Sequence, residues 1–168
     1  MAPRGRSGKK SSKGLLTKVI VMVVVAELAG VIGSVFTLPA IGSWYASLVK
    51  PWFTPSSWVF GPVWTTLYAL MGIAAGIVWH TKAEKRQTAL NLYFGQLGLN
   101  VIWSLLFFGL RSPLYALGEI VVLWIAIALT IRAFYPISKN AAMLLVPYIL
   151  WVTVATALNA GVWLLNVA

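Results

Sequence analysis

The amino-acid sequence predicts an all-α membrane protein, a bundle of five transmembrane helices. Of its 168 residues, 60% are hydrophobic and 10% are charged, and the mean hydropathy is +0.87. The apolar residues fall into five runs of roughly 20 to 26, and about 20 apolar residues in a helix cross the core of a bilayer. The composition excludes a water-soluble globular domain and a disordered chain. A membrane β-barrel is excluded because the runs do not alternate polar and apolar residues.

The predicted elements follow one another with short connections, with one exception. A basic tail, 1–14, rich in Gly, Ser, Lys and Arg, is expected to be disordered, and 15–168 is expected to form a single five-helix domain. The predicted spans, in order, are 15–36, 58–79, 90–109, 113–134 and 141–166. The exception is the long loop 37–57, which contains three prolines and four aromatic residues. The prolines exclude one long helix, so this loop lies in the head-group interface or covers a cavity as a lid.

The net charge of +10 is distributed as in a membrane protein and not as in a nucleic-acid-binding protein. Eleven basic residues fall in the tail and in the connections after the second and fourth spans, whereas Lys50 and Arg111 lie on the other side. Basic residues accumulate on the cytoplasmic side of membrane proteins. The distribution predicts a cytoplasmic N-terminus and an outside C-terminus in the plasma (inner) membrane, with the basic tail on anionic lipid. The expected partners are the lipid bilayer and a small hydrophobic ligand, with no nucleic acid.

Few residues could carry catalysis or bind a metal. The chain has no Cys, no Asp, three Glu and one histidine, His80. Without Cys, thiol catalysis, iron–sulfur clusters and disulfides are excluded. His80 closes the second predicted span and is expected to be exposed at the interface. The sequence therefore predicts no metal site, and axial ligation of a haem iron is not expected.

Three segments carry recognisable motifs. Residues 44–68 read WYASLVKPWFTPSSWVFGPVWTTLY, residues 95–109 read GQLGLNVIWSLLFFG, and residues 147–159 read PYILWVTVATALN. In this order, they resemble the signature segments of the TspO/MBR family, the translocator proteins and tryptophan-rich sensory proteins. The fifth span lacks the Tyr followed by Arg or Lys found in vertebrate members, so the resemblance is to a prokaryote-like member.

The resemblance implies a five-helix membrane receptor or sensor for tetrapyrroles and other hydrophobic aromatic molecules, with a role in tetrapyrrole transport or regulation. The ligand would be protoporphyrin IX or haem, and no cofactor would be required. Family members often form dimers, and a homodimer is expected. Two patterns of small residues, Gly72–Gly76 and Ala29–Gly33, allow close helix contact. They do not say whether that contact lies within the chain or between subunits.

Helical spacing supports a pocket between the spans, because aromatic residues share faces with polar or small ones at intervals of three and four. Trp64 and Trp151 are the strongest candidates, since indole rings stack on flat π-systems and the matching family tryptophans line the ligand pocket. Asn159 is expected to bond between helices, whereas the resemblance shifts Asn100 towards ligand contact. The predicted ligand-binding residues are Tyr45, Phe60, Trp64, Asn100, Tyr115, Trp151 and Ala155.

Two carboxylates, Glu27 and Glu119, lie inside predicted spans. An ionisable residue within a membrane indicates a functional site, here for protons or transport. The plain alternative for Glu27 is a protonated, hydrogen-bonded structural group. A receptor or sensor needs only the pocket and is the first hypothesis. The alternatives are a transporter of small hydrophobic molecules that uses Glu27, and a light- or oxygen-dependent porphyrin-degrading enzyme that uses Trp64 and Trp151.

Overall fold

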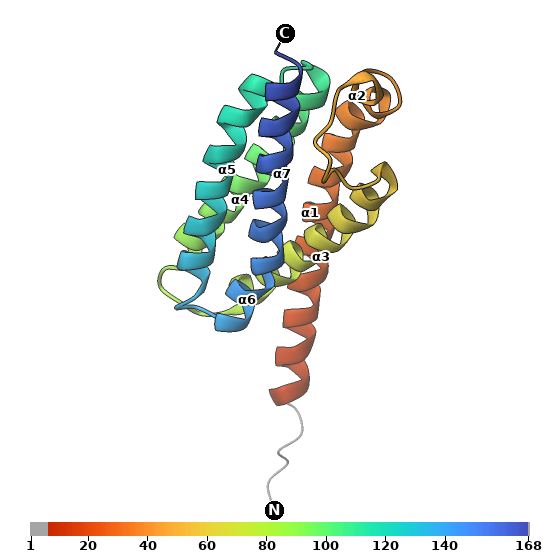
Figure 1. The fold of residues 1–168 in the computed structure, drawn as a ribbon. Coiled ribbons are helices and arrows are strands. Elements are labelled where there is room, and N and C mark those ends of the chain that lie inside the picture. Colours follow the sequence, from red (N-terminus) through yellow and green to blue (C-terminus); the bar gives the residue numbers. More distant parts are fainter. Residues whose placement is uncertain (1–6, 168) are drawn as a thin grey trace, which may run out of the picture.

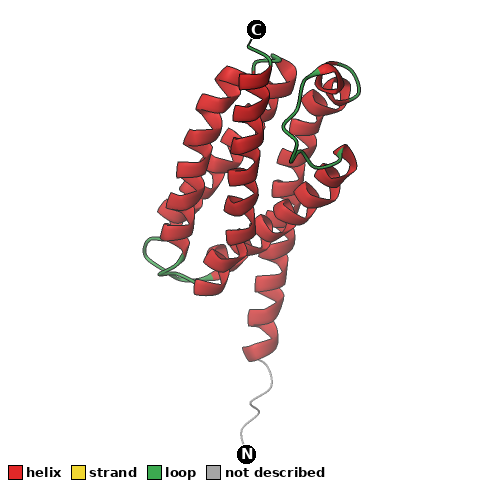
Figure 2. Ribbon diagram, in the orientation of Figure 1, coloured by secondary structure: helices red, strands yellow, loops and turns green. Residues whose placement is uncertain are grey.

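The computed structural model describes residues 7–167, so the first part of the predicted basic tail lies outside the described residues. No strand occurs in the described part of the chain (Figure 2). The helices are α1 (Ser7–Ile41), α2 (Trp44–Ser47), α3 (Ser57–His80), α4 (Arg86–Ser104), the π-helical turn η1 (Leu105–Gly109), α5 (Pro113–Phe134), α6 (Lys139–Leu144) and α7 (Val146–Leu165).

Five helical stretches within the described residues are long and apolar enough to span a membrane, which confirms the predicted fold class. They are Ser12–Ile41, Ser57–His80, Arg86–Gly109, Pro113–Phe134 and Lys139–Leu165. The chain is therefore an integral membrane protein. In Figure 1 the N-terminal end of α1 lies with the α3–α4 and α5–α6 connections, and α2 lies with the C-terminus at the opposite end. An odd number of spans places the two ends of the spanning bundle on opposite sides.

The first and last spans differ from the predicted bounds. Helix α1 begins at Ser7, inside the stretch expected to be disordered, and continues to Ile41, into the predicted loop. Pro39 lies in its last turn, where it removes the hydrogen bond to the carbonyl four residues earlier, and the helix ends two residues later. The last span is divided at Leu145 because Pro147 starts a new helix, α7, in one of its first two positions. The predicted lid is thus shorter at its start and contains the short helix α2.

Helices α1 and α3 are joined by small residues. A Cβ added to Gly72 would meet the backbone of Val23, and one added to Gly76 would meet the backbone of Val19. These glycines let the two backbones approach, so the Gly72–Gly76 pattern is used within the chain. Beyond this contact the N-terminal half of α3 diverges from α1 (Figure 1), and the space between the helices widens.

The other helices complete a closed bundle. Helix α4 packs between α1 and α5, and α5 packs against α7, as Figure 1 shows. By contrast, α3 and α7 touch little. The core is largest between α3, α4, α5 and α7, where its biggest fully buried side chains are Tyr93, Tyr148, Phe134, Met71 and Ile120. Close packing there leaves the diverging ends of α1 and α3 to frame a cavity.

Candidate functional site

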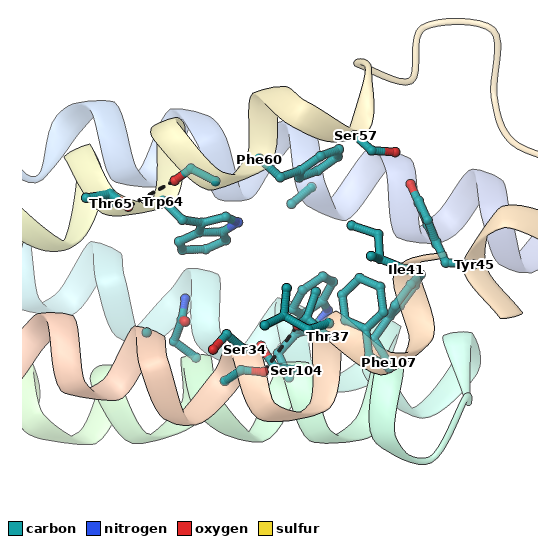
Figure 3. A pocket seen from close by; sticks show the side chains of 18 of the residues that line it. Ser34, Thr37, Ile41, Tyr45, Ser57, Phe60, Trp64, Thr65, Ser104 and Phe107 are labelled. Atoms are coloured by element: carbon teal, nitrogen blue, oxygen red, sulfur yellow. Dashed lines mark hydrogen bonds between the residues drawn. The ribbon is translucent and has the colours of Figure 1, made fainter. Parts of the chain in front are cut away.

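A cavity of about 470 Å³ lies between α1, α3, α4, η1 and α7, below the lid. This volume is in the range of sites for drug-sized ligands, roughly 300–1,000 Å³. The structure brings six of the seven predicted ligand-binding residues to its wall: Tyr45, Phe60, Trp64, Asn100, Trp151 and Ala155. Figure 3 shows Phe60 and Trp64 on one side facing Ser34 and Phe107 on the other, with Tyr45 at one end.

The seventh predicted residue, Tyr115, does not line the cavity. Its side chain is 70% exposed, whereas its neighbour Ala116 is fully buried. One residue along a helix turns the side chain by about 100°, since there are about 3.6 residues per turn. Because α5 buries Ala116, Ile120 and Leu123, Tyr115 points away from the bundle. Neither Tyr115 nor Glu119 is among the residues that line the cavity.

Sequence reasoning missed the contribution of α1 apart from Glu27, which does line the cavity. Ser34, Thr37 and Ile41 of α1 lie on the wall. Helix α1 carries no signal for these positions, because an almost uniformly apolar helix shows no preferred face. Phe107 was also omitted from the predicted set, although its spacing of seven from Asn100 puts both on one face.

The cavity has two aromatic walls. On one wall, Phe60 meets Trp151 edge to face, with ring centroids 5.9 Å apart. On the other, Trp103 and Phe107 are stacked at 5.1 Å. The faces and edges of aromatic rings attract other π-systems in these geometries. An apolar ligand with a flat conjugated ring can therefore be held between the walls.

The π-helical turn η1 helps to form the second wall. Its backbone departs from the α-helical pattern, since the amide of Leu110 donates to the carbonyl of Leu105 at 2.7 Å. Such turns are rare and often lie at functional sites. Here the turn begins two residues after Trp103, and both Phe107 and Phe108 line the cavity.

Two asparagines tie the helices together around the cavity. The Asn159 amide accepts a hydrogen bond from Trp103 Nε1 at 3.1 Å and donates to the Pro113 carbonyl at 2.7 Å. The interhelical interpretation of Asn159 is thus confirmed. Asn100 accepts from the Tyr68 hydroxyl and donates to the Tyr148 hydroxyl. Asn100 also lines the cavity, so it is placed for both structural and ligand contacts.

The cavity is open at the side of the bundle and covered at the end that carries α2. Among its lining residues, Leu38 of α1 is 70% exposed and Trp58 of α3 is 76% exposed. Both lie where α1 and α3 diverge. At the covered end Tyr45 packs edge to face on Phe107 and Phe108. Burial raises the pKa of Tyr45, so its hydroxyl stays neutral at physiological pH and can donate a hydrogen bond.

The lid is fastened to the end of α7. The side-chain amide of Asn166 accepts from the backbone amide of Val49 at 3.1 Å and donates to the Val49 carbonyl at 2.9 Å. Next to this pair, Pro51 packs on Gly161 so closely that a Cβ on the glycine would meet the proline ring. These contacts hold α2, and with it Tyr45, over the cavity.

Substituting Asn166 by alanine is expected to loosen the lid. Two hydrogen bonds to Val49 are lost, and each contributes about 1 kcal/mol. We expect a ligand in the cavity to dissociate several-fold faster, with about 1.4 kcal/mol corresponding to a factor of ten. Stopped-flow release of a fluorescent ligand measures this rate. The control is Asn91→Ala, which removes an exposed hydrogen bond to Gln87 on α4. Equal rates in both variants would show that the lid is not held by Asn166.

The cavity offers little to a metal ion. Within the described residues, no group of three or more His, Cys, Asp or Glu side chains could hold one. The one carboxylate on the wall is Glu27, and no His, Cys or Met lines the cavity. The polar side chains on the wall include Tyr68, Asn100 and Asn159, all three of which are buried.

The sequence model of the TspO/MBR family matches residues 21–164, a range that includes every residue of the cavity wall. The chain belongs to the TspO/MBR family. Relatives in this family are similar over most of their length. The tryptophan-rich protein TspO of Archaeoglobus fulgidus is 44% identical over 151 residues, which cover 90% of this chain and 98% of the relative.

Two further TspO/MBR proteins show the range of names in the family. The tryptophan-rich sensory protein of Cereibacter sphaeroides is 42% identical over 123 residues, 73% of this chain and 77% of its own. The translocator protein of Homo sapiens is 45% identical over 123 residues, 71% of this chain and 73% of its own. The family and these names support a role as a membrane receptor or sensor, and they confirm the resemblance seen in the three sequence motifs.

Proposed function

We propose that this chain is a membrane receptor or sensor whose cavity binds flat, hydrophobic aromatic molecules, with tetrapyrroles such as protoporphyrin IX or haem as the ligand class. The observation that supports this most is the pair of facing aromatic walls. Figure 3 shows Phe60 and Trp64 facing Phe107 across the cavity. Trp151 packs on Phe60 and Trp103 on Phe107, and indole rings stack on extended π-systems.

The wall chemistry fits a tetrapyrrole held by stacking. His, Cys and Met, the common axial ligands of haem iron, are absent from the residues that line the cavity. The hydroxyl of Tyr68 is engaged with Asn100. A metal-free porphyrin, or haem bound through its ring faces, is compatible with this set of side chains. Polar substituents of such a ligand would find Ser34, Thr37 and Glu27 on the α1 side.

A titration with protoporphyrin IX tests the proposal. Purified protein in detergent is titrated while tryptophan fluorescence and porphyrin absorbance are followed. Trp64→Phe and Trp151→Phe are each expected to weaken binding about fivefold, since an aromatic contact contributes about 1 kcal/mol. The matched control is Trp163→Phe, because Trp163 is partly buried but lies outside the cavity wall. Equal losses in all three variants would contradict the pocket assignment.

Two observations favour alternative fates for a bound ligand. Glu27 lies on the cavity wall, which favours proton-linked transport of a small hydrophobic molecule. Glu27→Gln that abolishes ligand flux in proteoliposomes but spares binding would support transport. Trp64 and Trp151 both lie on the wall, and a light-dependent fall in porphyrin absorbance that needs both would support degradation. Binding that is accompanied by neither ligand flux nor a loss of porphyrin absorbance would support the receptor.

We propose a plasma (inner) membrane location with a cytoplasmic N-terminus. Lys82, Lys85 and Arg86 of the α3–α4 connection lie at the same end as the start of α1, whereas Lys50 lies near α2 at the other end (Figure 1). Basic residues favour the cytoplasmic side. Single cysteines introduced at Ser47 and Gln87 should then react with an impermeant maleimide from opposite sides. The homodimer stays a prediction. The Gly72–Gly76 pattern does not support it, because these glycines pack against α1 of the same chain.

A further inference from the structure

A second set of polar groups lies inside the bundle, behind the ligand cavity. Both carboxylate oxygens of Glu119, both amide atoms of Gln96 and the Tyr93 hydroxyl are buried without a hydrogen-bond partner among the described residues. Gln96 is 1% exposed and Tyr93 is fully buried. None of the three is part of the cavity wall. Buried polar groups are nearly always paired with protein or ordered water, so this set points to a site with polar chemistry of its own.

Tyr148 of α7 joins the members of this set. It is fully buried, its hydroxyl accepts a hydrogen bond from Asn100 Nδ2 at 3.1 Å, and it interacts electrostatically with both Tyr93 and Glu119. Gln96 lies between Tyr93 and Asn100 on one face of α4, because residues three and four apart share a helix face. Buried polar side chains of α5, and of the helices α4 and α7 that pack against it, thus lie in one part of the bundle.

A chain of hydrogen bonds connects this set to the ligand cavity. The Tyr68 hydroxyl donates to Asn100 Oδ1, and Asn100 Nδ2 donates to the Tyr148 hydroxyl. Tyr68 and Asn100 line the cavity, as does Glu27, which interacts electrostatically with Tyr68. The chain of hydrogen bonds therefore runs from Tyr68, which shares the cavity wall with Glu27, to Tyr148 inside the bundle. Glu119 makes no direct hydrogen bond to this chain.

We propose that Glu119 is a proton-binding residue, solvated together with Tyr93 and Gln96, and that the Tyr68–Asn100–Tyr148 chain couples its proton to ligand occupancy of the cavity. A carboxylate that is removed from water and has no cationic partner carries a large desolvation cost. One proton from the aqueous phase, bonded to one carboxylate oxygen, removes the charge and returns to water on release. No other covalent bond changes.

The coupling passes through the direction of the hydrogen bonds, because the amide of Asn100 does not pass a proton along. Glu119 makes no direct hydrogen bond to Tyr148, so water that solvates the set carries the effect. An ionised carboxylate only accepts hydrogen bonds from that water, whereas a protonated carboxyl group also donates. A ligand that bonds to Tyr68 or Asn100 in the cavity changes the other end of the same chain. This coupling rests on the proposed function, but the proton site at Glu119 does not.

The surroundings of Glu119 contain few other ionisable groups. Helix α5 packs against α4, α6, α7 and η1, and η1 has no titratable side chain. The titratable or charged residues of these helices and of α5 itself are Arg86, Tyr93, Lys139, Tyr148, Tyr115 and Arg132. Arg86 donates to the Thr81 carbonyl, and Lys139, Tyr115 and Arg132 are exposed. Tyr93 and Tyr148 are therefore the groups that respond to a proton on Glu119.

The chain contains three glutamates and no aspartate, so the carboxyl signal of each glutamate can be measured separately. Full-length protein labelled with carbon-13 at the glutamate carboxyl gives three signals, assigned with Glu27→Gln, Glu84→Gln and Glu119→Gln. The chemical shift separates carboxylic acid from carboxylate. At neutral pH we expect the acid form for Glu119. A Glu119 signal at the carboxylate position at neutral pH would overturn the proton site.

Saturating protoporphyrin IX, which is unlabelled and therefore silent, then tests the coupling. We expect the Glu119 signal of the unaltered protein to shift on binding. Tyr148→Phe removes only a hydroxyl that is not on the cavity wall, so binding should persist while the shift is lost. Tyr68→Phe interrupts the chain at its other end and serves if Tyr148→Phe does not fold. Because Tyr68 lines the cavity, we expect weaker binding in this variant, and the shift is compared at saturating ligand. Binding without a shift, or a shift that survives Tyr148→Phe, would overturn the coupling. Absence of binding would overturn the proposed function and the coupling with it, while the Glu119 signal measured without ligand still decides the proton site.

Discussion

Substituting Ala155 by phenylalanine is expected to weaken ligand binding at least tenfold, which corresponds to about 1.4 kcal/mol. Ala155 lies on the wall of the 470 Å³ cavity, near Trp151 on the same helix. A phenyl ring at this position projects into the space that the ligand would fill. Because the cavity accepts the added volume, the fold should be preserved, and thermal unfolding should occur at an unchanged or higher temperature. Protoporphyrin fluorescence titration measures the loss.

The neighbouring residue provides a matched control. Val154 is 41% exposed on the surface of α7 and does not line the cavity. Val154→Phe adds a similar ring about 100° away around the helix, on the surface, and is expected to leave binding unchanged. If both variants bind as the unaltered protein does, the ligand does not occupy this cavity. If both lose binding together with thermal stability, the effect is on folding and not on the pocket.

Substituting Gly72 by leucine is expected to destabilise the bundle strongly. A Cβ at Gly72 would collide with the backbone of α1 at Met22 and Val23. Overpacking typically costs about 1–3 kcal/mol and sometimes more, and a backbone obstacle cannot rotate away as a side chain can. We expect a large drop in the unfolding temperature in detergent, or no recovery of folded protein. The cavity should be lost as well, because the α1–α3 contact sets where these helices diverge.

Gly118 of α5 provides the control for this prediction. A Cβ there would have no neighbour within 4 Å, and its position on α5 is exposed. Gly118→Leu is expected to be neutral or mildly stabilising, since glycine in a helix costs about 1 kcal/mol relative to alanine. Equal destabilisation at both positions would mean that helix α1 does not pack on α3 through Gly72.

Several features of this protein could be predicted from the sequence because they depend on local composition. The five spans follow from apolar runs of sufficient length, since the bilayer requires helices to satisfy their own backbone hydrogen bonds. The motif around Trp64 indicates the family, and the intramembrane position of Asn100 indicates an inward-facing polar residue. In these cases the membrane, or a run of consecutive residues, imposes the constraint, and no partner helix has to be known.

Other features were decided by the packing of helices that are distant in the sequence. Tyr115 and Ala116 are adjacent, and the contacts of α5 decide which of them is buried. An apolar helix such as α1 has no intrinsic inner face, so its cavity residues were found only in the assembled bundle. The lid contact between Val49 and Asn166 joins residues 117 positions apart. The sequence by itself determined how many helices cross the membrane and which side chains are available for chemistry. The tertiary structure decided which of those side chains meet, because a helix fixes the angle between its residues but not the direction in which they face.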